Sequence, residues 1–378
     1  MHTHKYMSLK FVISGGGTGG HVFPAIAIAK QISLELPSAE ILFVGAEGKI
    51  EMQKVPEAGY NILGLEVVGL QRKLTLKNIL KNLVFPFKLI KSLNRAKKII
   101  KDFNPDIAIG VGGYASGPTL RVAGKMKIPT LLQEQNSYAG LTNKLLAKNA
   151  SCICVAYDGM DRFFDKNKII FTGNPIRKDI LDNMNNRNEA ISHFNLDINK
   201  KTILVLGGSL GARTINLAIK QKLDLIDKNN VQVLWQTGKF YFENMSCIVK
   251  TKGFNNIHPK AFIKRMDLAY CVADIIISRA GALSVSELCI VKKPVILVPS
   301  PNVAEDHQTS NAKSLVNKKA AVHVKDVDAD TILVEKVLEL LNNEVKCAEL
   351  IENISVLARP DATEKIVNEI FKIVKFKN

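Results

Sequence analysis

Ser14-Gly15-Gly16-Gly17-Thr18-Gly19-Gly20-His21 is the stretch of this 378-residue chain that decides its fold. The apolar run at residues 9–13 predicts a buried strand before it, and apolar residues recur at helical spacing over 25–32 after it. Pro24 fits the first turn of that helix, where its missing N–H costs nothing. Glycines on a strand-to-helix turn let the backbone approach a ligand and present N–H groups at the positive end of the helix dipole. The stretch therefore predicts a phosphate or diphosphate site; the alternative is a turn that serves only tight packing.

The length and charge of the chain limit what it can be. A chain of 378 residues is too long for one ordinary core, so two domains are expected. The net charge of +17, from 52 Lys and Arg against 35 Asp and Glu, favours an anionic partner: nucleic acid, an acidic membrane surface or a phosphorylated substrate. A generally lysine-rich composition is the alternative.

Cysteine usage and hydropathy indicate the compartment. The six cysteines form no Cys-x-x-Cys pair and are interpreted as reduced core residues of a cytosolic protein. The first residues are polar, which argues against a signal peptide, and no run approaches the roughly 18 apolar residues of a transmembrane helix. We therefore expect a protein that is soluble or lies on a membrane surface.

Strand and helix patterns alternate to about residue 155 and then restart. Gly173-Asn174-Pro175 and the polar stretch 182–189 indicate an inter-domain connection, after which strand, glycine loop (207–211) and helix occur a second time. The alternation predicts an α/β protein with two Rossmann-like open parallel-sheet domains facing across a cleft, and ligands beyond the carboxyl ends of the strands. Strands are expected at 9–13, 41–44, 107–109, 130–132, 202–206, 231–235, 275–278 and 295–298, and a helix at 362–374 that could pack on either domain.

Gly15-x-Gly17-x-x-Gly20 also matches the dinucleotide fingerprint, so a nicotinamide or flavin enzyme is an alternative. That fingerprint needs an acidic residue at the end of the second strand to hold a ribose. Here Val44 leads into Gly45 and Glu47 comes late, which makes the signal weak.

Residues 278–287 form a second strand, small-residue turn and helix start. The N–H groups of residues 282–284 would suit a phosphate, and Glu287 could accept hydrogen bonds from both hydroxyls of a ribose. A capping box between Ser284 and Glu287 explains the same residues equally well.

Two further polar clusters have simpler explanations. Asp306-His307-Gln308-Thr309 would cap the helix that follows it. Asp326, Asp328 and Asp330 have a spacing that suggests a metal site, but they lack the glycine and distal glutamate of a calcium loop. Solvated N-cap residues are the favoured interpretation of these aspartates.

The segment 74–100 mixes apolar residues with many lysines at helical spacing, and Pro86 should kink or divide this helix. An apolar face with a basic rim suits an anionic bilayer surface. A core helix with a solvated basic face is the alternative.

Seven ordered blocks resemble the GT-B glycosyltransferases of family 28, in particular the N-acetylglucosaminyltransferases of bacterial peptidoglycan synthesis. The resemblance extends from about Leu9 to the segment 360–364. The blocks are Gly16-Gly17-Thr18-Gly19-Gly20-His21-Val22-Phe23-Pro24, Gly112-Gly113-Tyr114-Ala115-Ser116-Gly117-Pro118, Glu134-Gln135-Asn136, Ala139-Gly140-Leu141-Thr142-Asn143-Lys144, Gly173-Asn174-Pro175-Ile176-Arg177, Gly207-Gly208-Ser209-Leu210-Gly211-Ala212-Arg213 and residues 279–287.

The resemblance implies an inverting hexosyltransferase that moves N-acetylglucosamine from UDP-N-acetylglucosamine (UDP-GlcNAc) to the 4-hydroxyl of undecaprenyl-diphospho-muramoylpeptide (lipid I). It implies an acceptor-binding and membrane-associated domain at 8–174, a UDP-GlcNAc-binding domain at 175–359, and a C-terminal helix (360–378) that returns to the first domain. The segment 74–100 would face the cytoplasmic leaflet of the inner membrane. Nucleic acid, metal and cofactor are not implied.

The resemblance also implies site residues at the positions of this sequence that match the family's motifs. The donor would be contacted by Thr18, Gly19, Gly20, Asn136, Arg177, Ser209, Ile263, Gly281, Ala282, Leu283, Ser284, Val285, Ser286 and Gln308, with Glu287 on the ribose. The family varies around Gln308, and Ala280 stands where serine is common, so no hydroxyl contact is expected there.

The acceptor hydroxyl needs a base, and His21 is the first candidate because a free imidazole has a pKa of about 6.5. Glu134 is the second, and an orienting role for His21 remains open. A UDP-GlcNAc 2-epimerase on the same scaffold and a non-catalytic membrane-bound UDP-sugar-binding protein are the alternatives. The acceptor-side blocks around Tyr114 and Asn136 argue against both.

Overall fold

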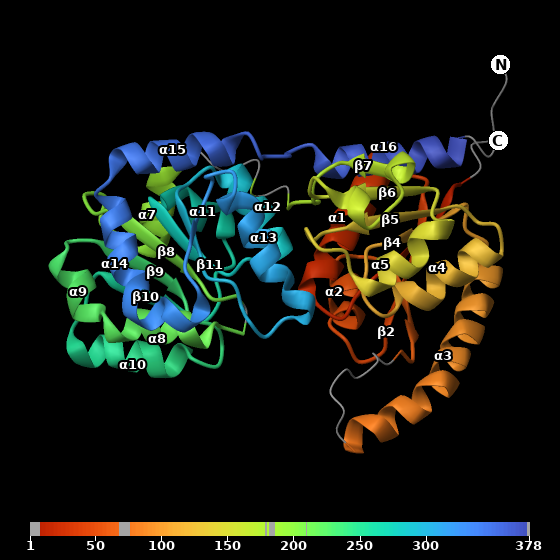
Figure 1. Cartoon of the computed structure of the whole chain (residues 1–378), viewed down its shortest axis with the longest axis horizontal. Coiled ribbons are helices and arrows are strands. Elements are labelled where there is room, and N and C mark those ends of the chain that lie inside the picture. The colour runs from red at the N-terminus through yellow and green to blue at the C-terminus, as the bar shows by residue number, and fades with distance from the viewer. Residues whose placement is uncertain (1–7, 68–75, 178–179, 181–185, 209, 376–378) are drawn as a thin grey trace. The chain divides into compact units, whose positions relative to one another are not determined.

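The computed structural model describes residues 8–67, 76–177, 180, 186–208 and 210–375. The chain divides into two compact units: unit 1 is Met1–Pro175 with Asp361–Asn378, and unit 2 is Ile176–Pro360. Each unit contains one open parallel sheet with helices packed on it (Figure 1). The predicted α/β class with two Rossmann-like domains is confirmed.

The sheet of unit 1 has seven parallel strands in the order β3-β2-β1-β4-β5-β6-β7. Its central strands are buried on both faces, which explains their nearly continuous apolar runs. The strands are β1 (Lys10–Ser14), β2 (Glu40–Ala46), β3 (Asn61–Leu65), β4 (Ile107–Gly110), β5 (Thr130–Glu134), β6 (Cys152–Val155) and β7 (Ile169–Phe171).

Helices cover both faces of this sheet. One core lies under α1 and α16, where Phe11 meets Phe371 edge-on at a centroid distance of 6.2 Å, and the other contains buried residues of α3 and α4. The C-terminal helix therefore packs on unit 1, beside α1 (Figure 1). The helices are α1 (Gly19–Glu35), α2 (Glu51–Glu57), α3 (Leu76–Phe103), α4 (Ser116–Lys125), α5 (Leu141–Leu146) and α16 (Ala362–Lys375).

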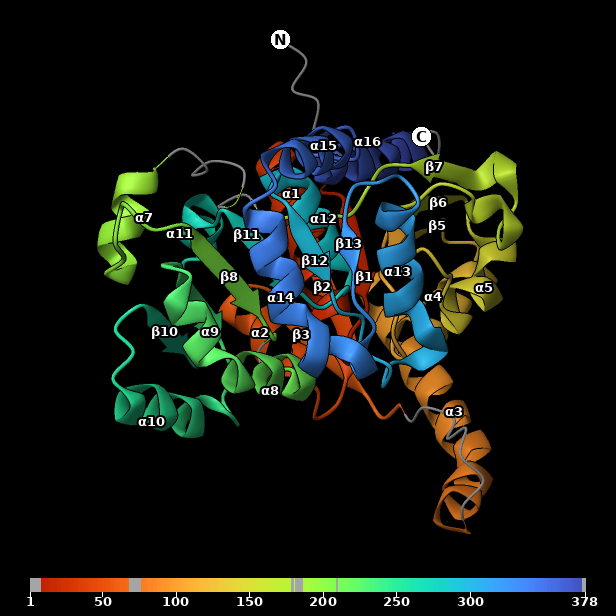
Figure 2. The ribbon, with the colours of Figure 1, turned by 60° about the vertical axis from the view of Figure 1, so that its left-hand side comes forward.

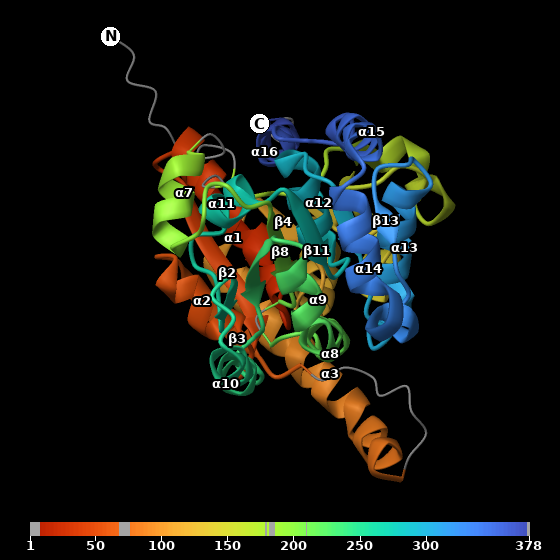
Figure 3. The same cartoon turned by 90° about the vertical axis from the view of Figure 1, so that its left-hand side faces the viewer.

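The expectation that Pro24 lies in the first turn of its helix is wrong. Pro24 is the sixth residue of α1, not part of its first turn, because the helix already begins at Gly19 within the glycine stretch. Of the two expectations for Pro86, a kink or a division of the helix, the division is wrong, because α3 continues past this residue. One end of α3 projects from unit 1 (Figures 1 and 3), and Pro86 in this helix is exposed. None of the helices in the described part of the chain combines the length and apolar character needed to cross a membrane.

The sheet of unit 2 has six parallel strands in the order β10-β9-β8-β11-β12-β13. The expected strands lie within two residues of the observed ones, while the edge strands of both sheets and the inner strand β6 were not among them. The strands are β8 (Thr202–Leu206), β9 (Gln232–Gln236), β10 (Ile257–Lys260), β11 (Ile275–Ser278), β12 (Val295–Leu297) and β13 (Val322–His323).

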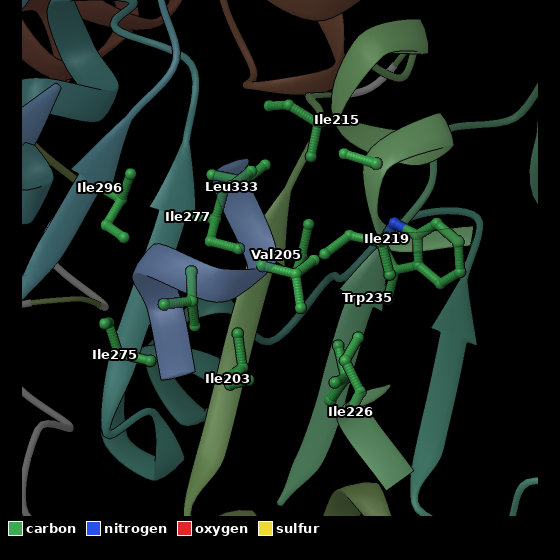
Figure 4. Packing of buried hydrophobic residues seen from close by; sticks show 14 of the residues in the cluster. Ile203, Val205, Ile215, Ile219, Ile226, Trp235, Ile275, Ile277, Ile296 and Leu333 are labelled. Atoms are coloured by element: carbon green, nitrogen blue, oxygen red, sulfur yellow. The ribbon is translucent and has the colours of Figure 1, made fainter. Parts of the chain in front are cut away.

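One face of this sheet packs against α8, α9 and α14 (Figure 2). Ile203, Val205 and Trp235 on the strands meet Ile219 and Leu333 on these helices (Figure 4). The helices of unit 2 are α7 (Arg187–Phe194), α8 (Arg213–Gln221), α9 (Leu223–Lys228), α10 (Phe242–Lys252), α11 (Met266–Val272), α12 (Ala282–Val291), α13 (His307–Val316), α14 (Ala329–Leu341) and α15 (Glu344–Ser355).

Both sheets reverse their strand order at one point, between β1 and β4 in unit 1 and between β8 and β11 in unit 2. Open parallel sheets bind ligands at such a point, beyond the carboxyl ends of the strands. The glycine loop of each unit and the loop after the neighbouring strand lie there.

Candidate active site

The glycine loop between β1 and α1 is held by the loop after β4. The N–H of Gly16 donates to the carbonyl of Gly112 at 3.3 Å, and a Cβ atom on Gly113 would lie 2.2 Å from the carbonyl oxygen of Gly16. Tight packing therefore explains some of these glycines. The N–H groups of Thr18, Gly19 and Gly20, at the start of α1, meet no acceptor among the described residues. They are suited to an anionic oxygen.

Glu51, the first residue of α2, holds the same loop in place, and the sequence did not indicate this role. Its side chain is 1% exposed, with Oε2 accepting from the N–H of Gly17 and Oε1 from the N–H of Ala46, both at 2.9 Å. A Cβ atom on Gly16 would lie 2.0 Å from Oε1. A dinucleotide site would need its acidic residue at the end of the second strand, whereas Glu51 lies in α2 and binds backbone N–H groups.

His21 is the third residue of α1 and is half-buried beside the loop after β4. Its Nδ1 lies 3.4 Å from the hydroxyl oxygen of Thr18. A Cβ atom on Gly112 would come within 2.9 Å of Nε2, so only glycine leaves room for the imidazole.

Glu134 ends β5 and is 2% exposed. Its Oε1 accepts from the backbone N–H of Asn136 (3.1 Å) and the Asn136 amide (3.4 Å), and its Oε2 from the N–H of Gly140 (3.0 Å) and the amide of Asn143 (2.9 Å). Burial raises the pKa of Glu134 above its usual value, and these hydrogen bonds oppose that effect. The carboxyl group thereby fixes the loop that carries Asn136.

In unit 2, α12 begins at Ala282 with Gly281 as its N-cap. Ser284 and Glu287 both lie inside the helix, so the capping-box interpretation is wrong. The N–H of Val285 donates to the carbonyl of Gly281, while those of Leu283 and Ser284 meet no acceptor in the described part of the chain. This terminus can therefore receive an anion.

Glu287 lies one turn along α12, and its carboxylate is contacted by Arg177 and Tyr270. The Nε of Arg177 is 3.6 Å from its Oε1, and the buried hydroxyl of Tyr270 donates to its Oε2 at 2.9 Å. The Glu287 side chain is 16% exposed. The structure thus brings together two predicted residues, and adds Tyr270, which lies in an apolar run and gave no signal in the sequence.

The remaining residues predicted to contact the UDP-sugar lie in several elements of both units. The backbone N–H of Ile263 donates to Gln236 Oε1, and Gln308 Oε1 accepts from the N–H of Ser300, each at 2.9 Å. Thr18, Gly19, Gly20 and Asn136 belong to unit 1 and the others to unit 2. Ser209 lies outside the described residues.

Arg279, at the start of the block 279–287, is tied to Asp326 and to the carbonyl of Val298. Asp326 also accepts from the Thr214 hydroxyl at 2.9 Å, so its interpretation as a solvated N-cap residue is wrong. Within the described residues, no group of three or more His, Cys, Asp or Glu side chains could hold a metal ion.

The chain has two open parallel sheets, each with a glycine loop at its point of reversal, and an acidic residue one turn along a helix with receptive N–H groups. These features are typical of enzymes with the GT-B fold that act on nucleotide-sugars. The chain belongs to glycosyltransferase family 28. Residues 11–155 match the N-terminal domain of that family, and residues 202–366 match its C-terminal domain.

Known relatives cover almost the whole chain. A protein of Phocaeicola vulgatus named UDP-N-acetylglucosamine--N-acetylmuramyl-(pentapeptide) pyrophosphoryl-undecaprenol N-acetylglucosamine transferase is 56% identical over 97% of this chain and 96% of its own length. A protein of Flavobacterium psychrophilum with the same name is 54% identical, over 97% and 98%.

Among solved structures, Acinetobacter baumannii MurG is similar with a TM-score of 0.76 and 29% identity, over 96% of this chain and 99% of that one. A UDP-N-acetylglucosamine 2-epimerase of Listeria monocytogenes gives a TM-score of 0.68 at 12% identity, over 96% of each chain, and shows only the shared fold.

Proposed function

We propose that this chain transfers N-acetylglucosamine from UDP-GlcNAc to the 4-hydroxyl of undecaprenyl-diphospho-muramoylpeptide, the step of peptidoglycan synthesis that turns lipid I into lipid II. Family membership and the names of relatives at 54–56% identity support the reaction. The observation that carries the proposal is the start of α12, where receptive N–H groups and the Glu287 carboxylate lie one turn apart. A diphosphate and a ribose need that combination.

Unit 2 is the donor-binding part in this proposal. The N–H groups at the start of α12 would hold the diphosphate, Arg177 would add positive charge, and Glu287 would accept from the ribose hydroxyls. The backbone around Ile263 and the amide of Gln308 would contact the nucleotide-sugar as well.

Unit 1 is the acceptor-binding part, so we reassign Thr18, Gly19, Gly20 and Asn136, which the resemblance placed on the donor, to the acceptor. The N–H groups of Thr18, Gly19 and Gly20 present a second anion site on the chain, and the Asn136 loop lies two strands from it in the sheet. A substrate that carries a diphosphate and a sugar hydroxyl suits this arrangement of N–H and amide groups.

In the transfer, the acceptor 4-oxygen bonds to C1 of N-acetylglucosamine while the bond from C1 to the UDP oxygen breaks, which inverts the anomeric centre. The proton of the 4-hydroxyl passes to a base and the charge on the departing UDP is held by N–H groups and Arg177. His21 is favoured as this base over Glu134, because both carboxyl oxygens of Glu134 already accept hydrogen bonds from its own loop. Glu134 would position Asn136.

The α3 helix supports a peripheral location on an anionic membrane. Phe87 is 75% and Ile90 57% exposed, and Lys88, Lys97 and Lys98 are exposed along the same helix. Exposed apolar side chains with flanking cations suit the headgroup region of an anionic bilayer. The resemblance implies the cytoplasmic face of the inner membrane, and we propose this location with α3 as the contact. The side chains of residues 76–84 lie outside the described part.

The reaction is tested by following UDP release and the sugar product with purified protein, UDP-GlcNAc and a muramoyl diphospholipid. The proposal expects UDP release that depends on the acceptor and matches the amount of disaccharide lipid. Conversion to a 2-epimeric UDP-sugar without acceptor would indicate the epimerase, and binding without turnover would indicate a sensor.

A further inference from the structure

A buried phenol stands behind the candidate ribose-binding carboxylate. Tyr270 belongs to α11, whose residues are all buried, and it is only 1% exposed. Its hydroxyl donates to Glu287 Oε2 at 2.9 Å. Since close packing surrounds the ring, the donor is fixed in place, and the carboxylate is held by a group that cannot move away.

Glu287 is also approached by a second, more exposed side chain. Arg177, whose side chain is 38% exposed, approaches the other oxygen, Oε1, at 3.6 Å from its Nε. Without the phenolic donor, the carboxylate could turn about its side-chain torsions toward the guanidinium. The Tyr270 bond therefore selects one orientation of the carboxylate.

The hydroxyl stays a hydrogen-bond donor over the whole working pH range. Burial raises the pKa of Tyr270 well above its usual value, and the negative charge of Glu287 raises it further. The bond from Tyr270 uses only part of the acceptor capacity of a carboxylate.

We propose that Tyr270 is a positioning residue for ribose selectivity: it orients the Glu287 carboxylate so that the site distinguishes a ribonucleotide from a 2′-deoxyribonucleotide. This inference rests on the proposed function, in which Glu287 receives the ribose. It assigns Tyr270 no contact with the substrate, so its effect must pass through Glu287.

The test compares the affinities of UDP and 2′-deoxy-UDP by calorimetry for the parent protein, Tyr270→Phe and Glu287→Gln. A hydrogen bond from a hydroxyl to a carboxylate gives the parent a preference for UDP of about tenfold to hundredfold. Tyr270→Phe should reduce that preference to less than about threefold, with little change in the affinity for 2′-deoxy-UDP. Tyr60→Phe, which removes a phenol–hydroxyl contact to Ser33 in unit 1, is the matched control and should keep the parent preference.

The outcomes separate the inference from the proposed function. An unchanged preference in Glu287→Gln would refute the ribose assignment itself. A reduced preference in Glu287→Gln with a parent-like preference in Tyr270→Phe would refute the positioning role. An equal loss of affinity for both nucleotides in Tyr270→Phe would also refute it, because a merely structural role has that effect.

Discussion

Replacing Gly16 by alanine should damage unit 1 through a single identified contact. The added methyl group would lie 2.0 Å from Oε1 and 2.7 Å from Oε2 of Glu51, so the carboxylate must move. It would then lose its bonds to the N–H groups of Gly17 and Ala46. Hydrogen bonds to a charged group contribute about 1.5–3 kcal/mol each. We expect the free energy of unfolding of unit 1 to fall by about 3 kcal/mol if part of this energy is recovered by rearrangement.

Urea denaturation followed by far-UV circular dichroism measures this loss, and a double-mutant cycle assigns its cause. In a Glu51→Ala background the methyl group meets no carboxylate, so Gly16→Ala should cost less than about 1 kcal/mol there. Gly124→Ala, whose Cβ has its nearest neighbour at 3.8 Å, is the control and should change stability by at most about 1 kcal/mol. UDP affinity should stay at the parent value, since unit 2 is untouched. The reasoning fails if Gly16→Ala is as stable as the parent, or equally costly in both backgrounds.

Three other results are expected. His21→Ala should lower turnover by about 10²–10⁴-fold, as for a lost general base, and remove the acidic limb of the pH–rate profile. A loss of turnover below tenfold with the acidic limb retained would indicate Glu134 as the base instead. Changing Phe87 and Ile90 to serine should reduce sedimentation with anionic vesicles, whereas Val345→Ser, which removes an apolar side chain 83% exposed in unit 2, should not; equal sedimentation would exclude α3 as the contact. Burial, with a smaller effect of Lys260, lowers the pKa of His258 below 6.5, so the folded protein binds this proton more weakly than the unfolded chain. Stability should therefore fall as the pH drops below about 6.5, and His258→Gln should show a smaller difference in melting temperature between pH 7.5 and 5.5; a difference equal to that of the parent would contradict this.

The sequence predicted the central strands and both glycine loops because their signals are local. A short apolar run followed by a glycine loop, such as 202–206, is typical of a strand buried on both faces, and glycines at strand ends indicate close approach of the backbone. Glu51 and Tyr270 gave no such signal. Glu51 acts through backbone N–H groups of segments 34 and 5 residues away, and Tyr270 through a carboxylate 17 residues away. Such contacts arise from the way helices pack on the sheet, and the spacing of residues in the sequence does not predict that packing.

The capping-box prediction failed for a related reason. Ser284 and Glu287 have the required spacing, but the helix starts earlier, because Gly281 already has the extended backbone of an N-cap. The first residue of such a helix depends on where the preceding strand ends and on the path of the loop between them. The same uncertainty placed Pro24 in the first turn of α1, although that helix begins at Gly19.

The anomeric outcome of the reaction tests the proposed transfer most directly. Purified protein is incubated with UDP-N-acetylglucosamine labelled with ¹³C at C1 and a muramoyl diphospholipid, and the product is read by NMR. The account predicts one labelled product, β-linked through C1 to the muramoyl 4-oxygen, that forms only with acceptor. A labelled product of α configuration, a label that stays on a 2-epimerised UDP-sugar, or no acceptor-dependent product would contradict it.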